Sequence, residues 1–413
     1  MRKRIVDILT VLTIAQFSSL GHAGSCIGEA SAFDPCRTQV ALDLRLRSEV
    51  FSQNNYEEDA LASLLKTRAN IDHQLAKGVN IQIELDNVSA IGAQRYNSTR
   101  NSLIDYPTIA DSEGSDLNQL WLGFTDSDLE FRLGRQRILI ADKRFIGSKP
   151  WRNNEQTYDG LRIKWSPTDD LNFDGSYVVN VNRVYGPVDG ENPADWDGDN
   201  LFFEAQYLVT QKVTAKSFFY DLDIEPQSGF AASKTVNNSS RTLGFSIEGE
   251  FSPFTFRSSV ALQGASGPSE LDYKADYYSF GLDATIAHSI LSLGIEQLGS
   301  DNNIGFSTPL ANGHGYQGWA DQFLRTPSAG VRDVWVGIDS TIDKVELKGA
   351  FHDFHAAIPN SEQHDFGREL DLLATWHVDK NLAVTAKAAI FDATESGILV
   401  NATKFWFMVE YSI

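Results

Sequence analysis

Basic residues at alternate positions of β-like segments are the residues of this chain best suited to binding a solute. Where apolar and polar residues alternate, the polar ones share one face of a strand. A guanidinium group binds both oxygens of a carboxylate, and an ammonium group attracts one as a point charge. The pattern therefore predicts a basic surface that attracts a carboxylate-bearing anion. The cations concerned are Arg45, Arg47, Lys66, Arg68, Arg132, Arg162 and Lys164.

Carboxylates alternate in the same way, so the polar faces carry both signs of charge. Glu84 and Asp86 stand among the cations, and more acids follow in later segments, where Arg257 and Lys348 also occur. The sequence leaves two interpretations open. The cations form a track for anions, or they only hydrate a wall and pair with neighbouring acids.

A short acidic stretch could hold a metal ion. Asp195, Asp197 and Asp199 place three carboxylates at alternate positions around Gly198. Oxygen ligands of this kind suit Ca²⁺, although the twelve-residue calcium loop with its terminal Glu is missing. We expect either a Ca²⁺ site on an external loop or a solvated acidic loop tip.

Catalytic chemistry finds little support in the sequence. His352, Asp353 and His355 lie close together and could form an acid–base pair. No nucleophile elbow, H-E-x-x-H motif or phosphate-binding loop accompanies them. We therefore expect no catalytic residues, no enzyme activity and, apart from the Ca²⁺ considered above, no cofactor.

The elements that must position these residues are β-strands. Period-two alternation over about ten residues occurs in eighteen segments between residues 39 and 413. Every second connection is short, as at residues 76–78 and 379–380, and the others are long. This plan is typical of an all-β fold, a transmembrane antiparallel β-barrel with short periplasmic turns and long extracellular loops. Its apolar faces meet lipid and its polar faces line the lumen.

Two long connections are candidates for narrowing that lumen. Residues 139–156 combine the apolar Phe145 and Trp151 with several cations, and residues 299–330 contain Trp319 and repeated glycines. We expect that either connection folds inward and constricts the channel. The alternative is an external loop packed on its neighbours.

The N-terminus predicts export. Residues 1–23 join a basic start, an apolar run and a small-residue end, which is typical of a secretory signal peptide. Residues 24–413 contain no linker or shift of composition, so we expect a single barrel domain. Cys26 and Cys36 predict a disulfide in an exported chain, with two free thiols as the alternative.

The formal net charge of −20 argues against nucleic acid as a partner, because nonspecific binding to phosphates needs basic patches. The partners that we expect are outer-membrane lipid, the barrel-assembly machinery, and an anionic polysaccharide or small hydrophilic solute. The expected location is the outer membrane of a Gram-negative bacterium.

Several motifs resemble those of the alginate-export family of Gram-negative outer-membrane barrels. They are G-R-Q-R-I at 134–138, R-F-I-G at 144–147, W-R-N-N-E-Q-T-Y-D-G at 151–160 and K-F-W at 404–406. The resemblance implies luminal arginines that guide a polyuronate outward. Carried over to this chain, the resemblance selects Arg68 and Arg162 from the cations above and adds Arg135, Arg137, Arg152 and, as a paired acid, Asp159.

Two features do not follow the simplest barrel pattern. Arg135 and Arg137 fall on the apolar phase of their segment, so they need a bulge or a position beyond the lipid rim. Outer-membrane barrels usually end on an aromatic residue that the assembly machinery reads, whereas this chain ends at Ile413 with Tyr411 nearest.

Three functions are consistent with these observations. The leading prediction is a passive, porin-like channel for an anionic, carboxylate-bearing solute or polymer, and by resemblance the export of an alginate-like polysaccharide. The second is a porin that takes up small organic acids or other hydrophilic solutes. The third is a barrel-borne enzyme or adhesin.

Overall fold

The computed structural model describes residues 37–360, 363–394 and 398–413. The predicted signal peptide and the two cysteines, Cys26 and Cys36, lie outside the described residues. Within these ranges, no helix has the length and apolar character needed to cross a membrane.

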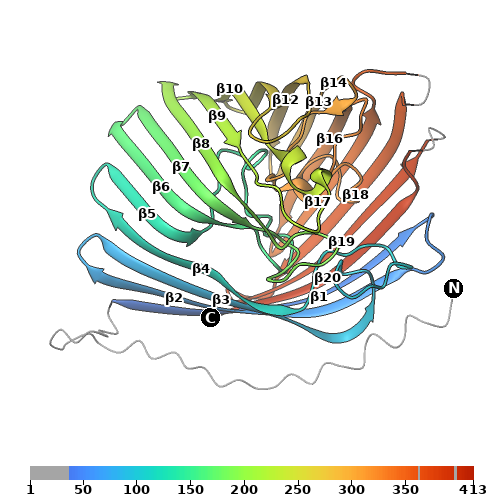
Figure 1. Ribbon diagram of the computed structural model, residues 1–413, viewed down its shortest axis with the longest axis horizontal. Helices are drawn as coiled ribbons and strands as arrows, with labels where there is room; N and C mark the ends of the chain where they lie inside the picture. The colour runs from blue at the N-terminus through green and yellow to red at the C-terminus, as the bar shows by residue number, and fades with distance from the viewer. Residues whose placement is uncertain (1–36, 361–362, 395–397) are drawn as a thin grey trace.

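Eighteen antiparallel strands form one closed sheet (Figure 1). β1 pairs with β2 on one side and with β20 on the other, so the first and last strands close the wall. Closure leaves no strand edge unpaired, which is the condition for placing β backbone in hydrocarbon. The predicted all-β barrel of about eighteen strands is confirmed.

The strands of the wall follow one another in chain order, each paired with the next. They are β1 (Thr38–Gln53), β2 (Ala60–Ala76), β3 (Val79–Arg95), β4 (Gly114–Thr125), β5 (Leu129–Gln136), β6 (Thr157–Thr168), β7 (Leu171–Asn182), β8 (Asp195–Thr210), β9 (Val213–Leu222), β10 (Ser240–Phe251), β11 (Phe254–Ala265), β12 (Lys274–Ile286), β13 (Ser289–Leu298), β16 (Val331–Ile342), β17 (Val345–His355), β18 (Asp365–His377), β19 (Leu382–Ala393) and β20 (Ala402–Ser412).

Connections alternate in length around the barrel. One end carries turns of two to four residues, such as 77–78 and 343–344, and the other carries loops of six to thirty-two residues. The longest loop, 299–330, contains the small hairpin β14 (Ser300–Asp301) and β15 (Ile304–Gly305) and the 3₁₀ turn η4 (Gly313–Gly315). Two further 3₁₀ turns, η2 (Ala232–Lys234) and η3 (Val236–Asn238), lie in the loop between β9 and β10.

The outer and inner faces of the wall differ as a membrane barrel requires. Apolar residues point outward, for example Leu133, Phe245 and Val336, which are 52%, 46% and 55% exposed. Trp165 and Trp376 are exposed on the outer face near the short turns, where an aromatic girdle meets the lipid interface. The wall therefore buries its apolar face in lipid and leaves its polar face for the lumen.

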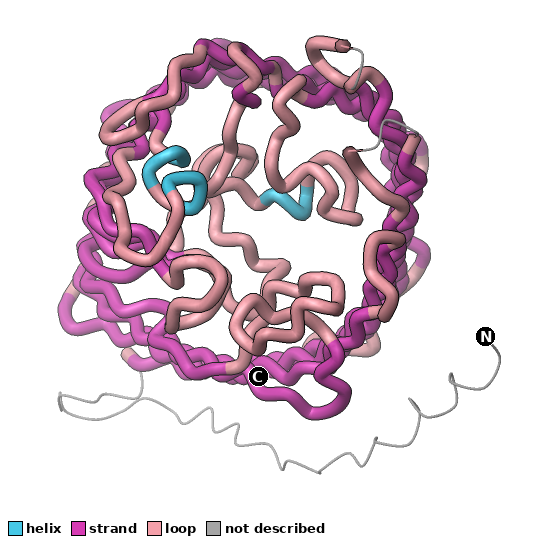
Figure 2. The backbone as a smooth tube through the Cα atoms, turned by 45° about the vertical axis from the view of Figure 1, so that its right-hand side comes forward, coloured by secondary structure: helices cyan, strands magenta, loops and turns pink. Residues whose placement is uncertain are grey.

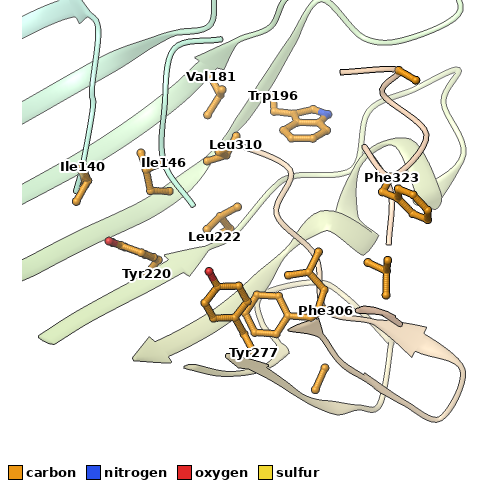
Figure 3. Packing of buried hydrophobic residues seen from close by; sticks show 14 of the residues in the cluster. Ile140, Ile146, Val181, Trp196, Tyr220, Leu222, Tyr277, Phe306, Leu310 and Phe323 are labelled. Atoms are coloured by element: carbon orange, nitrogen blue, oxygen red, sulfur yellow. The ribbon is translucent and has the colours of Figure 1, made fainter. Parts of the chain in front are cut away.

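Long loops occupy the inside of the barrel. Figure 2 shows loop segments crossing the space that the strands enclose. Their apolar residues pack on inward-facing rings of the wall, and Figure 3 shows Phe306 beside Tyr277 of β12. The centroids of these two rings are 5.6 Å apart, and Phe145 lies 5.1 Å from Tyr277. The lumen thus has an apolar core of its own on the β8–β13 side.

Candidate functional site

The loop of residues 137–156 lies inside the barrel, bound to cations of β1. The guanidinium of Arg45 donates to the carbonyl of Arg152 at 2.7 Å and to the Oδ1 of Asn153 at 3.0 Å. Arg47 donates to the carbonyl of Trp151 and forms a 2.6 Å ion pair with Asp111. These cations hold a loop against the wall instead of standing free in the lumen.

Glu155 is the centre of a second attachment. Its carboxylate lies 3.6 Å from Lys66, 2.9 Å from Arg68 and 2.5 Å from Arg137. Arg137 and Arg68 also bind Glu84 of β3. Burial alone would raise the pKa of the Glu155 carboxyl, but Lys66, Arg137 and Arg68 hold that pKa well below its usual range. Glu155 is therefore ionised at neutral pH and fastens the loop to β2.

The loop of residues 299–330 also folds inward, and Asp321 joins it to the first loop. The Asp321 carboxylate lies 3.3 Å from Arg152, 2.8 Å from Lys404 of β20 and 2.8 Å from His314. Burial alone would raise the pKa of Asp321, but Lys404 and Arg152 help to hold it well below its usual range. Both connections that the sequence left open as constrictions thus enter the lumen together.

Lys387 of β19 sits in an aromatic cage between these two loops. Its Nζ lies 4.1 Å from the ring centroid of Trp151 and 3.7 Å from that of Trp319. It also lies 2.6 Å from the Nε2 of His314, whose Nδ1 is bonded to Asp321. Burial lowers the pKa of His314 to about 3, so the neutral ring accepts from Lys387 and donates to Asp321. The cation–π contacts replace a carboxylate as the partner of Lys387.

A cavity of about 700 Å³ remains beside the two loops, between them and the wall from β9 to β17. A row of charged side chains crosses the part of the cavity that lies nearer the short turns. Lys216 of β9 lies 3.0 Å from Glu248 of β10, Arg257 of β11 binds Asp283 of β12, and farther round the wall Lys348 lies 3.4 Å from Asp339. We call these six side chains the charged row.

The charged row is open to the lumen. Arg257 and Lys348 are 47% and 46% exposed, in contrast to 2% for Arg47. Lys216, Arg257 and Lys348 are each the fourth residue of a strand that begins at a short turn, and so is Arg132 of β5. Residues at equal distances from the short turns lie at similar heights in a barrel. This regular spacing in the sequence therefore indicates that these cations lie at one level of the lumen.

The predicted track divides into three groups. Arg45, Arg47, Lys66, Arg68, Arg137 and Arg152 lie in the lumen and fasten the loop of residues 137–156. Three others lie on the inner face of the wall, where each meets an acid within 4 Å. They are Arg132, Arg162 and Lys164, paired with Glu130, Asp174 and Glu130.

Arg135 and Asp159 differ from the prediction, because they lie on the outer face. They stand opposite each other in register, on the same face as the exposed Leu133 and Ile163. The guanidinium binds the carboxylate through two contacts of 2.8 and 2.9 Å. The pair lies at the loop end of β5 and β6, so it meets the rim of the membrane and does not line the pore. Arg137 turns inward because β5 ends at Gln136.

The expected external calcium loop is part of a strand. Asp195, Asp197 and Asp199 lie at alternate positions of β8, which begins at Asp195. Alternate residues of a strand are roughly 7 Å apart, too far for three carboxylates to reach one Ca²⁺ at ~2.4 Å. The described residues hold no group of three or more His, Cys, Asp or Glu that could bind a metal.

Comparison with known proteins decides the family. The model of the alginate export family matches residues 37–284. The chain belongs to the alginate-export family. No curated protein matches it.

Two solved structures of the same fold come from Gram-negative bacteria. The barrel resembles Acinetobacter baumannii OccAB2 with a TM-score of 0.71 and 14% identity, covering 93% of this chain and 99% of that one. It resembles Pseudomonas aeruginosa OccK3 (OpdO) with a TM-score of 0.67 and 10% identity, covering 91% and 95%. Together with its family, this fold makes the alginate-export protein a porin-like channel of the Gram-negative outer membrane.

Proposed function

We propose that this channel carries a carboxylate-bearing saccharide chain outward, and that the charged row is where the chain first binds. One observation carries the proposal: cations that are about half exposed stand near the short turns of β11 and β17. Short turns face the periplasm in barrels of this kind. A solute arriving from the periplasm meets these cations before it reaches the inward loops.

Each cation of the row already has a carboxylate partner, so binding proceeds by exchange. Exposed ion pairs contribute only ~0–1 kcal/mol, because water competes for both charges. A carboxylate of the solute can therefore replace Asp283 at Arg257, or Asp339 at Lys348, at little cost. Successive uronate units offer a carboxylate at regular intervals, which suits stepwise exchange along the row.

Carboxylates are numerous around the cavity, so net charge alone does not select anions. The lining carries six carboxylates and three Lys or Arg side chains. Two of these acids are engaged deeper in the wall, since Glu296 binds Arg144 and Asp333 binds His352. Selection for carboxylates then rests on the guanidinium and ammonium groups that remain accessible, and we expect a moderate preference for anions.

The decisive experiment compares anion preference with and without the exposed cations. We expect the double variant Arg257→Gln, Lys348→Gln to lower the anion-to-cation permeability ratio about threefold, measured as a reversal potential in a salt gradient across a planar bilayer. Arg241→Gln is the matched control, because Arg241 is 57% exposed on the outer face and also pairs with an acid, Asp221. An unchanged ratio in the double variant would contradict the proposal.

The uptake of small organic acids is the second candidate, and the cavity supports it, because its volume of about 700 Å³ can hold a whole small solute. The concentration at which a solute blocks the ion current distinguishes polymer export from uptake of small organic acids. Export of a polymer predicts block by uronate oligomers at lower concentration than by a small tricarboxylate, and uptake predicts the reverse.

The route to the membrane belongs to the same proposal. We propose that residues 1–23 direct export and are removed, and that the barrel-assembly machinery inserts the chain. β20 completes the wall by pairing with β1 and β19. Replacement of Tyr411 by a polar residue tests this step through the yield of folded barrel in cells.

A further inference from the structure

Aromatic rings line the part of the cavity that is nearer the long loops than the charged row is. Tyr316 and Trp319 come from the loop of residues 299–330, and Trp335 and Tyr277 come from the wall. The cavity therefore combines ring surfaces at one level with exposed cations at another. Neither ion conduction nor carboxylate exchange at the row requires such rings.

Trp335 lies directly over a glycine of the neighbouring strand. It stands opposite Gly294 in register. A Cβ atom at position 294 would lie 2.5 Å from the Cζ2 of Trp335 and 2.7 Å from its Cε2. Glycine is thus required for the indole to rest against the wall. One side of the ring covers the backbone of β13, and the ring also lines the cavity.

Tyr316 of the loop of residues 299–330 offers a second ring to the same cavity. Its hydroxyl donates to the carbonyl of Asp142, and the guanidinium of Arg144 lies 4.7 Å from its ring centroid. Arg144 is itself fixed by a 2.6 Å contact with Glu296. The ring is therefore held by both inward loops and by the wall, and it also lines the cavity.

We propose that Trp335 and Tyr316 form a stacking site for a pyranose ring, so that the channel distinguishes cyclic sugar acids from open-chain carboxylates of equal charge. The face of a pyranose presents C–H groups that carry partial positive charge, and the face of an aromatic ring is negative. The carboxylate of the same unit reaches an exposed cation of the charged row. This inference rests on the proposed function and names the residues that set its specificity.

Two solutes of equal charge make the test sharp. Glucuronate has a pyranose ring, whereas gluconate has the same number of carbons and one carboxylate on an open chain. The full-length protein is inserted in a planar bilayer, and the concentration of each solute that halves the current is measured. We expect the wild-type channel to bind glucuronate several-fold more tightly than gluconate.

Variants then test whether the indole of Trp335 causes the difference between glucuronate and gluconate binding. Trp335→Leu is expected to weaken glucuronate binding roughly three- to tenfold and to leave gluconate unchanged, while Trp335→Phe restores most of the difference. Gly294→Ala keeps the indole but displaces it, so we expect a loss in the same direction. Trp376→Leu is the matched control, because Trp376 is 51% exposed on the outer face.

The outcomes separate this inference from the proposed function. Equal binding of the two solutes by the wild type, or equal weakening of both in Trp335→Leu, overturns the stacking site even if the channel prefers anions. Absence of an anion preference overturns the proposed function, and a glucuronate preference that depends on Trp335 would still support the stacking site. Migration of Trp335→Leu and Gly294→Ala as compact barrels in detergent until heated verifies that both variants keep the barrel.

Discussion

At the scale of single residues, the face on which an arginine stands decides what it can do. Arg132 and Arg135 are three positions apart on β5 and have opposite surroundings. Arg132 faces the lumen, lies 2.8 Å from Glu130 and covers the ring of Trp121 at 4.5 Å. Arg135 faces outward to Asp159. Strict alternation places Arg135 on the outer face, whereas the family resemblance alone implies a place for it in the lumen.

These two arginines make a matched pair for one prediction. We expect Arg132→Gln to lower the anion-to-cation permeability ratio about twofold, because it removes a charge that is 31% exposed in the lumen. Arg135→Gln should leave the ratio unchanged, since its charge lies outside the pore. Reversal potentials of both variants under the same salt gradient check the assignment, and a shift of similar size in Arg135→Gln would contradict it.

At the scale of elements, the two inward loops form one plug, because the Arg152–Asp321 ion pair and the hydrogen bond from the Gly147 N–H to the Leu310 carbonyl join them. Alternation on β1 and β2 was sufficient to predict that Arg47, Lys66 and Arg68 face inward. Their partners were not predictable, because Asp111 and Glu155 come from loops whose paths depend on the whole barrel. The alternative left open by the sequence, in which the cations pair with acids, describes this part of the wall.

Asp321 is the position at which to test the plug. Asp321→Asn leaves Lys404 and Arg152 buried without their carboxylate, a loss of ~3–5 kcal/mol for a buried pair. We expect the loop of residues 299–330 to detach from the wall, with higher and noisier single-channel conductance and faster cleavage of that loop by protease. Asp221→Asn, which breaks the exposed pair with Arg241 on the outer face, should change neither conductance nor cleavage.

The same carboxylate gives the plug a defined dependence on pH. The pKa of Asp321 is depressed in the folded protein, so its contribution to stability is complete above the ordinary value of about 3.9. It is lost as the pH falls from that value through the lower pKa of the folded state. We therefore expect wild-type conductance to stay constant from pH 7 to about pH 4 and to rise at lower pH, whereas Asp321→Asn should lack this rise.

At the scale of the whole molecule, the wall and its contents obey different rules. Alternation and turn length predicted the closed wall, the strand number and the outer face, because a membrane imposes them on every strand. The contents of the lumen depend on contacts between residues far apart in sequence. Around Lys387 of β19 gather Trp151 and His314 from the two inward loops and Trp406 from β20. These residues come from four separate segments, so no local sequence pattern predicts the cage.

Because the wall and the contents of the lumen are determined separately, we predict that the plug can be removed without unfolding the wall. Replacement of residues 306–329 by a short Gly-Ser linker keeps the β14–β15 hairpin and every strand pair of the barrel. We expect the variant to fold, to migrate as a compact barrel until heated in detergent, and to conduct several-fold more current, since conductance follows the open cross-section.

Solute recognition should respond differently, because the removed segment carries Tyr316 and Trp319 but none of the charged row. The variant should lose its distinction between glucuronate and gluconate and retain its anion preference. A variant that fails to form the barrel would mean that the plug supports the wall. A variant that keeps the wild-type conductance would mean that the loop of residues 137–156 sets the constriction by itself.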